Sequence, residues 1–398
     1  MITPLRLAIA ALLCAGAAVR AQLPPSTASF GGAATVSIPF RTIHGLVVIP
    51  VTINGHGPLN LILDTGAPVI VIPDTALASK LGLQIVGNAR VGGAGDGEVQ
   101  TAPLAAGITA SVGSLTVSGA FGIIGVAGDV IPGVDGVIGG ALFRHAAVEF
   151  DLDAGVIRFH DPAAHTTSIS GDVVPLRVEP SLHSFVPGTI VVNADTVKID
   201  LHVDTGARQT LSLAQSTMAR FSAKPTTTIP TVVGFGSRGA ARGDAIRADA
   251  LHLGASAIAN IPTYVPNNEP GEQGRIGLRV LERFNFVVDY PGKRLVLRPR
   301  TKPPEAFRFT TTGIVFQPGR DSVHRRVAFV IAGSPAERAG IAAGDSVFAV
   351  GGVALTTLTE DGVSRAVVTP RAGDTITLTT TRAGKREDRT LVARTILP

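Results

Sequence analysis

Two aspartates of this chain lie in the same four-residue context, and that context suggests acid–base chemistry. Asp64 lies in LILDTGAPVIVI and Asp204 in KIDLHVDTGARQTLSL, so Asp-Thr-Gly-Ala occurs at 64–67 and again at 204–207. Random order would produce only about 0.2 Asp-Thr-Gly triplets in such a chain. A lone carboxylate between apolar strands is costly to ionise, and a second carboxyl group opposite it would relieve that cost by sharing one proton. The charged member of such a pair can activate water while the protonated member polarises a carbonyl group.

The residues that follow each aspartate have matching tasks. The glycines allow a tight turn and a close approach of the backbone, and the threonines can hydrogen-bond across a two-fold axis. Such bonds would hold the two catalytic candidates, Asp64 and Asp204, face to face. The predicted supporting residues of the two loops are Thr65, Gly66, Ala67, Thr205, Gly206 and Ala207.

An internal repeat surrounds the two motifs. Each copy is predicted to run strand, turn, strand, Asp-Thr-Gly-Ala, strand, followed by a helix-like piece at 75–81 or 213–221. Each copy ends with a glycine, a short helix and a strand pair, and this glycine follows the aspartate by 75 residues in the first copy and 73 in the second. The shared order and spacing predict two related β units.

The doubled motif resembles that of aspartic peptidases of the bacterial retropepsin-like and pepsin-like group, over about residues 30 to 300. The resemblance implies a mainly β fold with two tandem acid-protease-type β-barrel lobes related by a pseudo-two-fold axis, at 30–165 and 172–300, and no cofactor. Retropepsins build their site from two chains and pepsins from one. Both lobes are present here, so an intramolecular site is expected, with pairing of each lobe with another chain as an alternative.

The same resemblance implies flaps over a peptide cleft, formed by the glycine-rich hairpins at 91–99 and 233–239. The flap and substrate-binding candidates are Gly92, Gly93, Gly95, Gly234, Phe235 and Gly236. Two differences from the pepsin sequence pattern affect the expected acidity of the aspartate pair. Alanine follows each triplet where pepsins usually have a hydroxyl, and Arg208 would place a cation near the pair.

Residues 307–398 resemble a PDZ domain, on the segment GSPAERAGIAAGDSVFAVGG. The resemblance implies a small β-barrel with short helices. It also implies that a protein or peptide C-terminus is bound at an exposed strand edge formed by Gly313, Ile314, Val315 and Phe316. The alternative is a packing module that stabilises the second lobe.

The first 21 residues are typical of a secretory signal peptide. Arg6 precedes an apolar stretch, and cleavage is expected after Ala21. We therefore expect a periplasmic or secreted protein with no stable membrane span after cleavage, and peripheral attachment to the membrane is compatible with this. An N-terminal anchor is the alternative. The single cysteine, Cys14, lies in this segment, so thiol nucleophiles, disulfides and thiolate metal sites are not expected in the mature chain.

Charge and composition argue against several other functions. The formal net charge is +5, from scattered arginines interleaved with acids, and there is no tryptophan, so no nucleic-acid partner is expected. The histidines show no metal-ligand spacing, so no metal is assigned. The sequence thus predicts an exported aspartic endopeptidase that acts on a peptide or protein substrate. The alternative is a noncatalytic periplasmic peptide-binding or scaffold protein.

Overall fold

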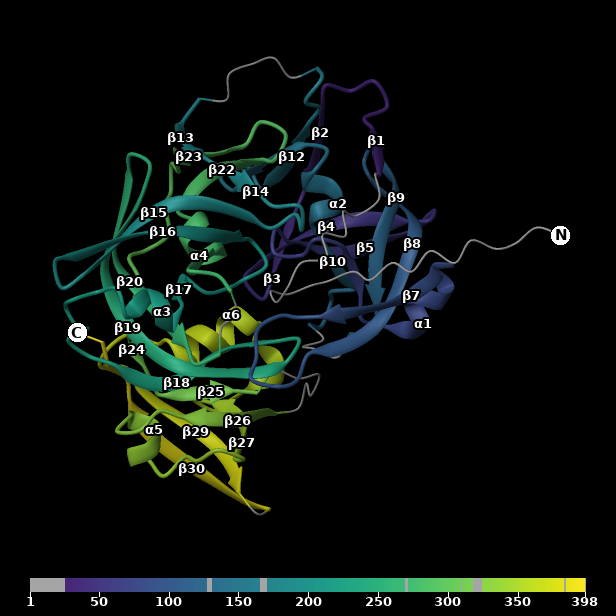
Figure 1. Ribbon diagram of the computed structural model, residues 1–398. Helices are drawn as coiled ribbons and strands as arrows, with labels where there is room; N and C mark the ends of the chain where they lie inside the picture. Colours follow the sequence, from purple (N-terminus) through teal and green to yellow (C-terminus); the bar gives the residue numbers. More distant parts are fainter. Residues whose placement is uncertain are drawn as a thin grey trace.

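The computed structural model describes residues 26–126, 131–164, 170–268, 271–308, 310–317, 324–382 and 384–397. The predicted signal peptide at 1–21 lies outside these ranges. Figure 1 shows a purple-to-blue β unit beside a teal-to-green one, and a yellow C-terminal unit against the second. Within the described ranges, no helix has the length and apolar character needed to cross a membrane.

The first β unit closes into a barrel. The antiparallel pair β4–β5 continues through β10, which runs parallel to β5, and then through β6 and β9; β8 closes the ring by pairing with both β9 and β4. Asp74 caps the short helix α1 by accepting hydrogen bonds from two backbone amides. The elements are β1 (Thr27–Ser29), β3 (Arg41–Ile43), β4 (Leu46–Ile53), β5 (His56–Leu63), β6 (Ile70–Ile72), α1 (Thr75–Lys80), β7 (Gln84–Val91), β8 (Gln100–Val112), β9 (Leu115–Ile124), β10 (Gly136–Ile138) and α2 (Gly140–Phe143).

The second β unit repeats this ring in the same cyclic order. Strands β15, β16, β21, β17, β20 and β19 take the places of β4, β5, β10, β6, β9 and β8. The helix expected at 213–221 is shorter than predicted. The elements are β14 (Arg177–Val178), β15 (Ser184–Val192), β16 (Asp195–Asp204), β17 (Leu211–Leu213), α3 (Gln215–Met218), β18 (Ile229–Gly236), β19 (Gly239–Leu253), β20 (Ser256–Pro266), β21 (Gly274–Gly277) and α4 (Leu278–Leu281). The predicted pair of β-barrels is confirmed.

A six-stranded sheet joins the ends of the two copies. Its order is β13-β23-β22-β11-β12-β2, so that β11 of the first copy pairs with β22 of the second. Phe150 and Phe286 stack here with ring centroids 4.4 Å apart, and both side chains are fully buried. This packing fixes the two barrels relative to each other. The strands are β2 (Thr35–Pro39), β11 (Ala147–Asp151), β12 (Val156–His160), β13 (Asp172–Pro175), β22 (Phe284–Asp289) and β23 (Arg294–Pro299).

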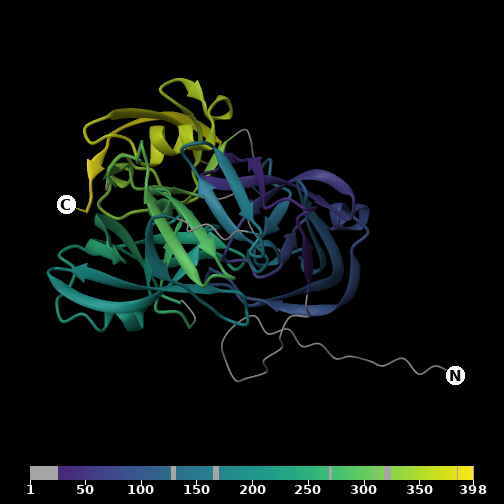
Figure 2. The same ribbon diagram turned by 90° about the horizontal axis from the view of Figure 1, so that it is seen from above.

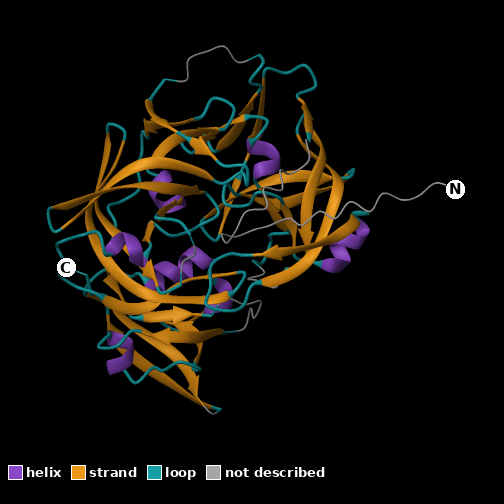
Figure 3. Cartoon of the chain, viewed as in Figure 1, coloured by secondary structure: helices purple, strands orange, loops and turns teal. Residues whose placement is uncertain are grey.

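The C-terminal unit has a core of its own, which includes Ile314, Val347 and Leu378. Its main sheet has the order β25-β26-β27-β29-β30, with β28 paired to β27. Its β26 lies next to β18 of the second barrel (Figure 1). Figure 2 shows the yellow C-terminal unit beside the green part of the chain, and strands dominate here as elsewhere (Figure 3). The elements are β24 (Thr310–Thr311), β25 (Ile314–Phe316), β26 (Arg325–Val330), α5 (Pro335–Arg338), β27 (Ser346–Val350), β28 (Val353–Ala354), η1 (Leu355–Thr357), α6 (Glu360–Val363), η2 (Ser364–Val368), β29 (Thr375–Arg382), β30 (Lys385–Val392) and β31 (Arg394–Thr395).

Removal of an aromatic ring from the joining sheet should destabilise the whole two-barrel unit. We expect Phe286→Ala to lower the free energy of unfolding by about 3–5 kcal/mol, because it leaves a cavity beside Phe150. Urea unfolding measures this. Val173→Ala is the control, because Val173 is exposed on β13 of the same sheet. A loss no larger than that of the control would contradict the role of this sheet.

Candidate active site

The two Asp-Thr-Gly-Ala loops occupy equivalent places in the two barrels. Asp64 directly follows β5 and Asp204 is the last residue of β16, and each of these strands is paired in parallel with the strand that carries the repeated glycine. A Cβ on Gly139 would lie 1.8 Å from the Asp64 carbonyl oxygen, so only glycine allows this strand to approach the loop. The repeated glycines predicted from the sequence therefore seat the two loops.

Four hydrogen bonds tie the two loops together. The Thr65 amide donates to Thr205 Oγ1 and the Thr205 amide donates to Thr65 Oγ1, both at 3.0 Å. Thr65 Oγ1 donates to the Val203 carbonyl at 2.6 Å, and Thr205 Oγ1 donates to the Leu63 carbonyl at 2.8 Å. Both threonines are buried. The structure thus contains the two-fold threonine contact that the sequence predicted.

The two carboxyl groups share a hydrogen-bond donor. The Gly206 amide lies 3.0 Å from Asp64 Oδ1 and 3.0 Å from Asp204 Oδ1, and the Gly66 amide donates to Asp64 Oδ1 at 2.7 Å. A Cβ on Gly206 would lie 2.2 Å from Asp64 Cγ, and one on Gly66 would lie 2.8 Å from Asp204 Oδ1. Each glycine therefore leaves room for the carboxyl group of the opposite loop.

The alanines of the motif act through their backbones. The Ala67 and Ala207 amides donate to the carbonyls of the preceding aspartates, each at 3.3 Å. The Ala67 carbonyl accepts from the Gly140 amide at 2.8 Å, and the Ala207 carbonyl accepts from the Leu278 amide at 2.7 Å. Each loop is in this way fastened to the short helix that follows the repeated glycine.

The environment separates the two carboxyl groups electrostatically. Burial and the neighbouring Asp204 carboxylate raise the pKa of Asp64 well above its ordinary value, and the Gly66 and Gly206 amides offset only part of this rise. On the other side, Arg275 Nη1 lies 3.1 Å from Asp204 Oδ2. A carboxyl group that favours its proton therefore faces one that is paired with a cation.

Sequence reasoning missed Arg275. It named Arg208 as the cation beside the pair, and the structure records for Arg208 a long hydrogen bond to the His44 carbonyl at 3.4 Å. Arg275 lies on β21, in the segment GRIG, and it reaches Asp204 because β21 pairs in parallel with β16. This pairing joins segments about 70 residues apart. An alignment of GRIG with GVIG at 136–139 could have identified Arg275, because the arginine occupies the position of Val137 in the first copy.

The predicted flaps meet each other. The Arg238 amide donates to the Ala94 carbonyl at 3.0 Å, and the Gly97 amide donates to the Arg238 carbonyl at 2.9 Å. The Gly92 carbonyl accepts from Ser237 Oγ at 2.9 Å and the Gly93 carbonyl from Arg238 Nε at 2.8 Å. The hairpin tips of the two barrels are therefore interlocked, and a peptide must separate them to enter from this side.

Glycine is needed at several flap positions. A Cβ on Gly95 would lie 2.4 Å from the Arg238 carbonyl carbon, and one on Gly236 would lie 2.6 Å from the Ala94 oxygen. Gly234 and Phe235 lie on β18, where Gln209 donates its side-chain amide to the Val233 carbonyl. Since Gln209 comes soon after the second motif, this bond connects the second flap to the active-site loop.

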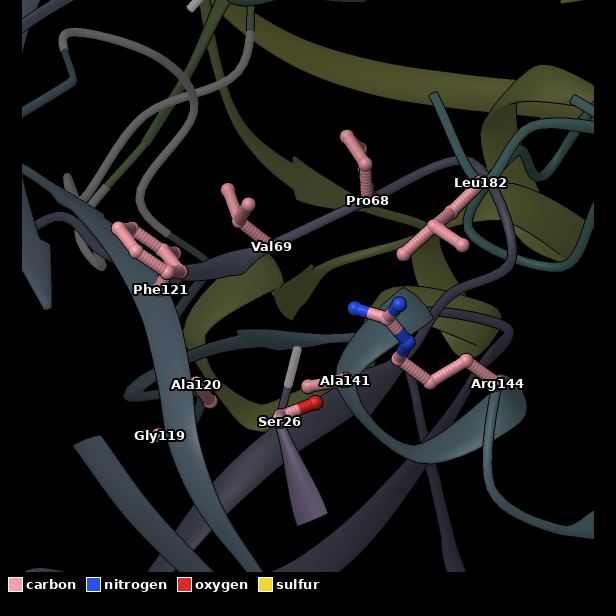
Figure 4. Close-up of a pocket in the computed structure, with 9 residues that line it drawn as sticks. All are labelled: Ser26, Pro68, Val69, Gly119, Ala120, Phe121, Ala141, Arg144 and Leu182. Atoms are coloured by element: carbon pink, nitrogen blue, oxygen red, sulfur yellow. The ribbon is translucent and has the colours of Figure 1, made fainter. Parts of the chain in front are cut away.

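A small recess lies beside the first loop (Figure 4). It is lined by Pro68 and Val69, which directly follow the first motif, and by Leu182 and Arg144. Its volume is about 10 Å³, room for no more than one water molecule. It is too small to hold a peptide side chain.

The predicted C-terminus-binding residues lie at an edge strand. Ile314 is buried, whereas Val315 and Phe316 are partly exposed, and β25 pairs with β26 along one side. The Gly313 amide donates to Thr311 Oγ1 at 2.9 Å and the Ile314 amide to Thr312 Oγ1 at 3.3 Å. A bound carboxylate would have to compete with these two hydroxyl groups.

Comparisons with known proteins agree with both predicted resemblances. Residues 49–141 match the aspartyl protease family model and residues 311–392 match the PDZ domain model. No curated protein matches the sequence. Residues 49–141 thus resemble aspartyl proteases, and residues 311–392 resemble PDZ domains.

Several solved structures are similar at low sequence identity. The aspartic proteinase from Irpex lacteus is 15% identical over 67% of this chain and 98% of its own, with a TM-score of 0.43. A retropepsin-like aspartic protease from Rickettsia conorii is 21% identical over 33% of this chain and 96% of its own, with a TM-score of 0.24. The photosystem II D1 C-terminal processing protease is 24% identical over 22% of this chain, which spans only 23% of that protein, with a TM-score of 0.20. Each TM-score is below 0.5, so function has to be inferred from the site itself.

Loss of one threonine hydroxyl should weaken the contact between the loops. Thr205→Val would leave the buried Thr65 amide and the Leu63 carbonyl without their partner, at a cost of roughly 1–3 kcal/mol for each group in the free energy of unfolding. Denaturant titration measures this. Thr205→Ser keeps the hydroxyl and serves as the control. Equal stability of the two variants would show that the hydroxyl does not bear the contact.

Proposed function

We propose that the protein is an exported aspartic endopeptidase in which Asp64 and Asp204 activate water. The observation that supports this most strongly is the Gly206 amide, which lies 3.0 Å from an oxygen of each carboxyl group. Two carboxyl groups held this close share one proton. With the threonine bonds across the loops, the pair has the preorganisation that hydrolysis without metal or thiol requires.

The reaction follows from a pair that holds one proton. The charged carboxylate removes a proton from a water molecule, whose oxygen bonds to the carbonyl carbon of the peptide. The protonated carboxyl group gives its proton to the carbonyl oxygen, which forms a neutral tetrahedral diol. The nitrogen then takes the remaining proton from the pair, while the other carboxylate removes a proton from one hydroxyl group of the diol. The carbon–nitrogen bond breaks, and an amine and a carboxylic acid leave. Atoms and charge balance, and the pair is again singly protonated.

The flaps and the PDZ domain suggest how the substrate is handled. The flap tips would open to admit an extended peptide and close over it. The edge strand β25 would add a protein or peptide C-terminus as a further strand. Export depends on the predicted signal peptide, and no nucleic acid or cofactor enters the proposal.

One observation favours the noncatalytic alternative, a periplasmic peptide-binding or scaffold protein. The guanidinium group of Arg275 is paired with Asp204, one of the two carboxyl groups on which catalysis would depend. Purified protein that cleaves no peptide between pH 3 and 7 but still captures partners through its PDZ domain would support this alternative.

Replacement of either aspartate should abolish peptide turnover. We expect Asp64→Asn and Asp204→Asn each to lower the rate by about 10²–10⁴-fold, because neither variant can both hold and accept the shared proton. Digestion of a proteome-derived peptide library at several pH values, followed by mass spectrometry, measures the rate. Asp249→Asn replaces a partly exposed aspartate of β19 and should retain full turnover. Unchanged turnover in Asp64→Asn would end the proposal.

The PDZ domain should distinguish a free C-terminus from a blocked one. Peptides from a C-terminal library are expected to bind at least about tenfold more tightly with a free carboxylate than as C-terminal amides, because only the carboxylate carries charge into the Gly313 loop. Fluorescence anisotropy with the full chain measures both affinities. Equal binding, or none, would instead favour the packing module.

A further inference from the structure

The two barrels differ in charge at one set of equivalent positions next to the aspartates. Two residues before Asp64, Ile62 pairs with Val137, which in turn pairs with Val71. At the same places in the second barrel, His202 pairs with Arg275, which pairs with Ser212. The three positions beside Asp64 are thus apolar, whereas the three equivalent positions beside Asp204 are polar.

Arg275 is held firmly in this polar set. Its Nη1 lies 3.1 Å from Asp204 Oδ2, its Nη2 lies 2.6 Å from Glu272 Oε1, and its Nε donates to the same Glu272 oxygen at 2.9 Å. Glu272 Oε2 in turn lies 2.9 Å from His202 Nδ1. The side chains of Asp204, Glu272 and His202 are at least 90% buried, and that of Arg275 is 22% exposed. The cation is fixed from two sides, with little water to screen it.

We propose that Arg275 is a positioning residue that holds the shared proton on Asp64 and the negative charge on Asp204. The inference rests on the proposed function and assigns the roles that the paired carboxyl groups alone leave open. Asp204 is the base that takes the proton from water. Asp64 is the acid that donates to the carbonyl oxygen.

The contacts of the two carboxyl groups support this assignment. Their Oδ1 atoms share the Gly206 amide, so this donor does not distinguish them. They differ in their other neighbours, because Asp204 Oδ2 faces the guanidinium group of Arg275, whereas the groups that act on Asp64 are the Asp204 carboxylate and the Gly66 and Gly206 amides. An opposite charge at this distance favours ionisation of the carboxyl group it contacts, and like-charge repulsion then keeps the proton on the other.

Of the other titratable groups around Arg275, His183 and Tyr290 are neutral at mid pH and Glu272 is charged. Burial and the nearby His202 and Arg275 lower the pKa of His183 to about 4, so His183 is neutral above that pH. Burial raises the pKa of Tyr290, which stays neutral. Burial would raise the pKa of Glu272, but Arg275 and His202 outweigh it and bring that pKa down to about 2. Glu272 is therefore ionised and draws part of the arginine charge away from Asp204.

Two substitutions should shift the pH profile in opposite directions. Arg275→Met removes the cation, so the pKa values of the pair rise, and both limbs of the pH profile of kcat/KM should move up by about one pH unit. Glu272→Gln removes a competing carboxylate, so the pKa values of the pair fall and both limbs should move down. Arg275→Lys keeps the charge and should stay closer to the wild type than Arg275→Met.

The control is Arg279→Met, which removes an exposed arginine four residues further on, from α4, and should leave the profile unchanged. An unchanged profile in both Arg275→Met and Glu272→Gln, with all proteins folded, would overturn the proposal. So would shifts in the same direction. If Arg275→Met fails to fold, Glu272→Gln still tests the sign of the shift.

A second measurement does not require activity. Carbon-13 NMR of protein labelled at the aspartate carboxyl groups, with assignment by Asp64→Asn and Asp204→Asn, reports which carboxyl group titrates first. We expect Asp204 to ionise at lower pH than Asp64 in the wild type, and the gap to narrow in Arg275→Met. The reverse order would overturn the proposal. If Asp204 ionises before Asp64 in a protein that cleaves no peptide, the proton assignment holds and the proposed peptidase activity is refuted.

Discussion

The hydrogen bonds between Thr65 and Thr205 are the constraint on which the site depends. Each amide donates to the hydroxyl of the opposite threonine, and each hydroxyl donates to a carbonyl of the opposite barrel. All of these groups are buried, so separation of the loops would leave several of them without partners, at a cost of about 1–3 kcal/mol for each. Two carboxyl groups that repel each other when both are charged are held together by this contact. In the proposed function, the proton that the pair shares is therefore a consequence of backbone geometry and does not depend on attraction between the acids.

The contact between the loops needs two barrels that cannot rotate against each other, and the six-stranded sheet meets that need. Strands β11 and β22 come from different copies and pair directly, with Phe150 and Phe286 stacked between neighbouring strands. Because both copies belong to one chain, the contact between the two loops is intramolecular and does not depend on protein concentration. The hairpin tips add a third contact between the barrels, through the hydrogen bonds of Arg238 and Ser237. The barrels are thus joined through the loops, through the sheet and through the flaps.

Features that depend on local sequence patterns could be predicted, whereas features that depend on pairing between distant segments could not. The barrels, the motif loops and the flap hairpins could be predicted because the same order of apolar strands and glycines occurs twice along the sequence. The joining sheet and the flap contacts depend on pairing between segments far apart in the chain, so no local pattern reports them. Arg275 was missed for the same reason, because its meaning comes from its register with His202. The helix predicted at 213–221 is shorter in the structure. It spans only Gln215–Met218, a single turn between β17 and the loop before β18.

A duplicated chain can do what a symmetric pair of identical chains cannot. In a homodimer every substitution appears twice, so an arginine beside one catalytic carboxylate would also stand beside the other, and the two acids would stay equivalent until substrate binds. Here the second copy carries Arg275 and Glu272, whereas the first keeps Val137 at the matching place. The barrel geometry tolerates the change, because these side chains lie beside the loop and leave the threonine bonds intact. If Arg275 acts as we propose, duplication within one chain gives the pair a fixed polarity, with the proton on Asp64 and the negative charge on Asp204 before a peptide binds.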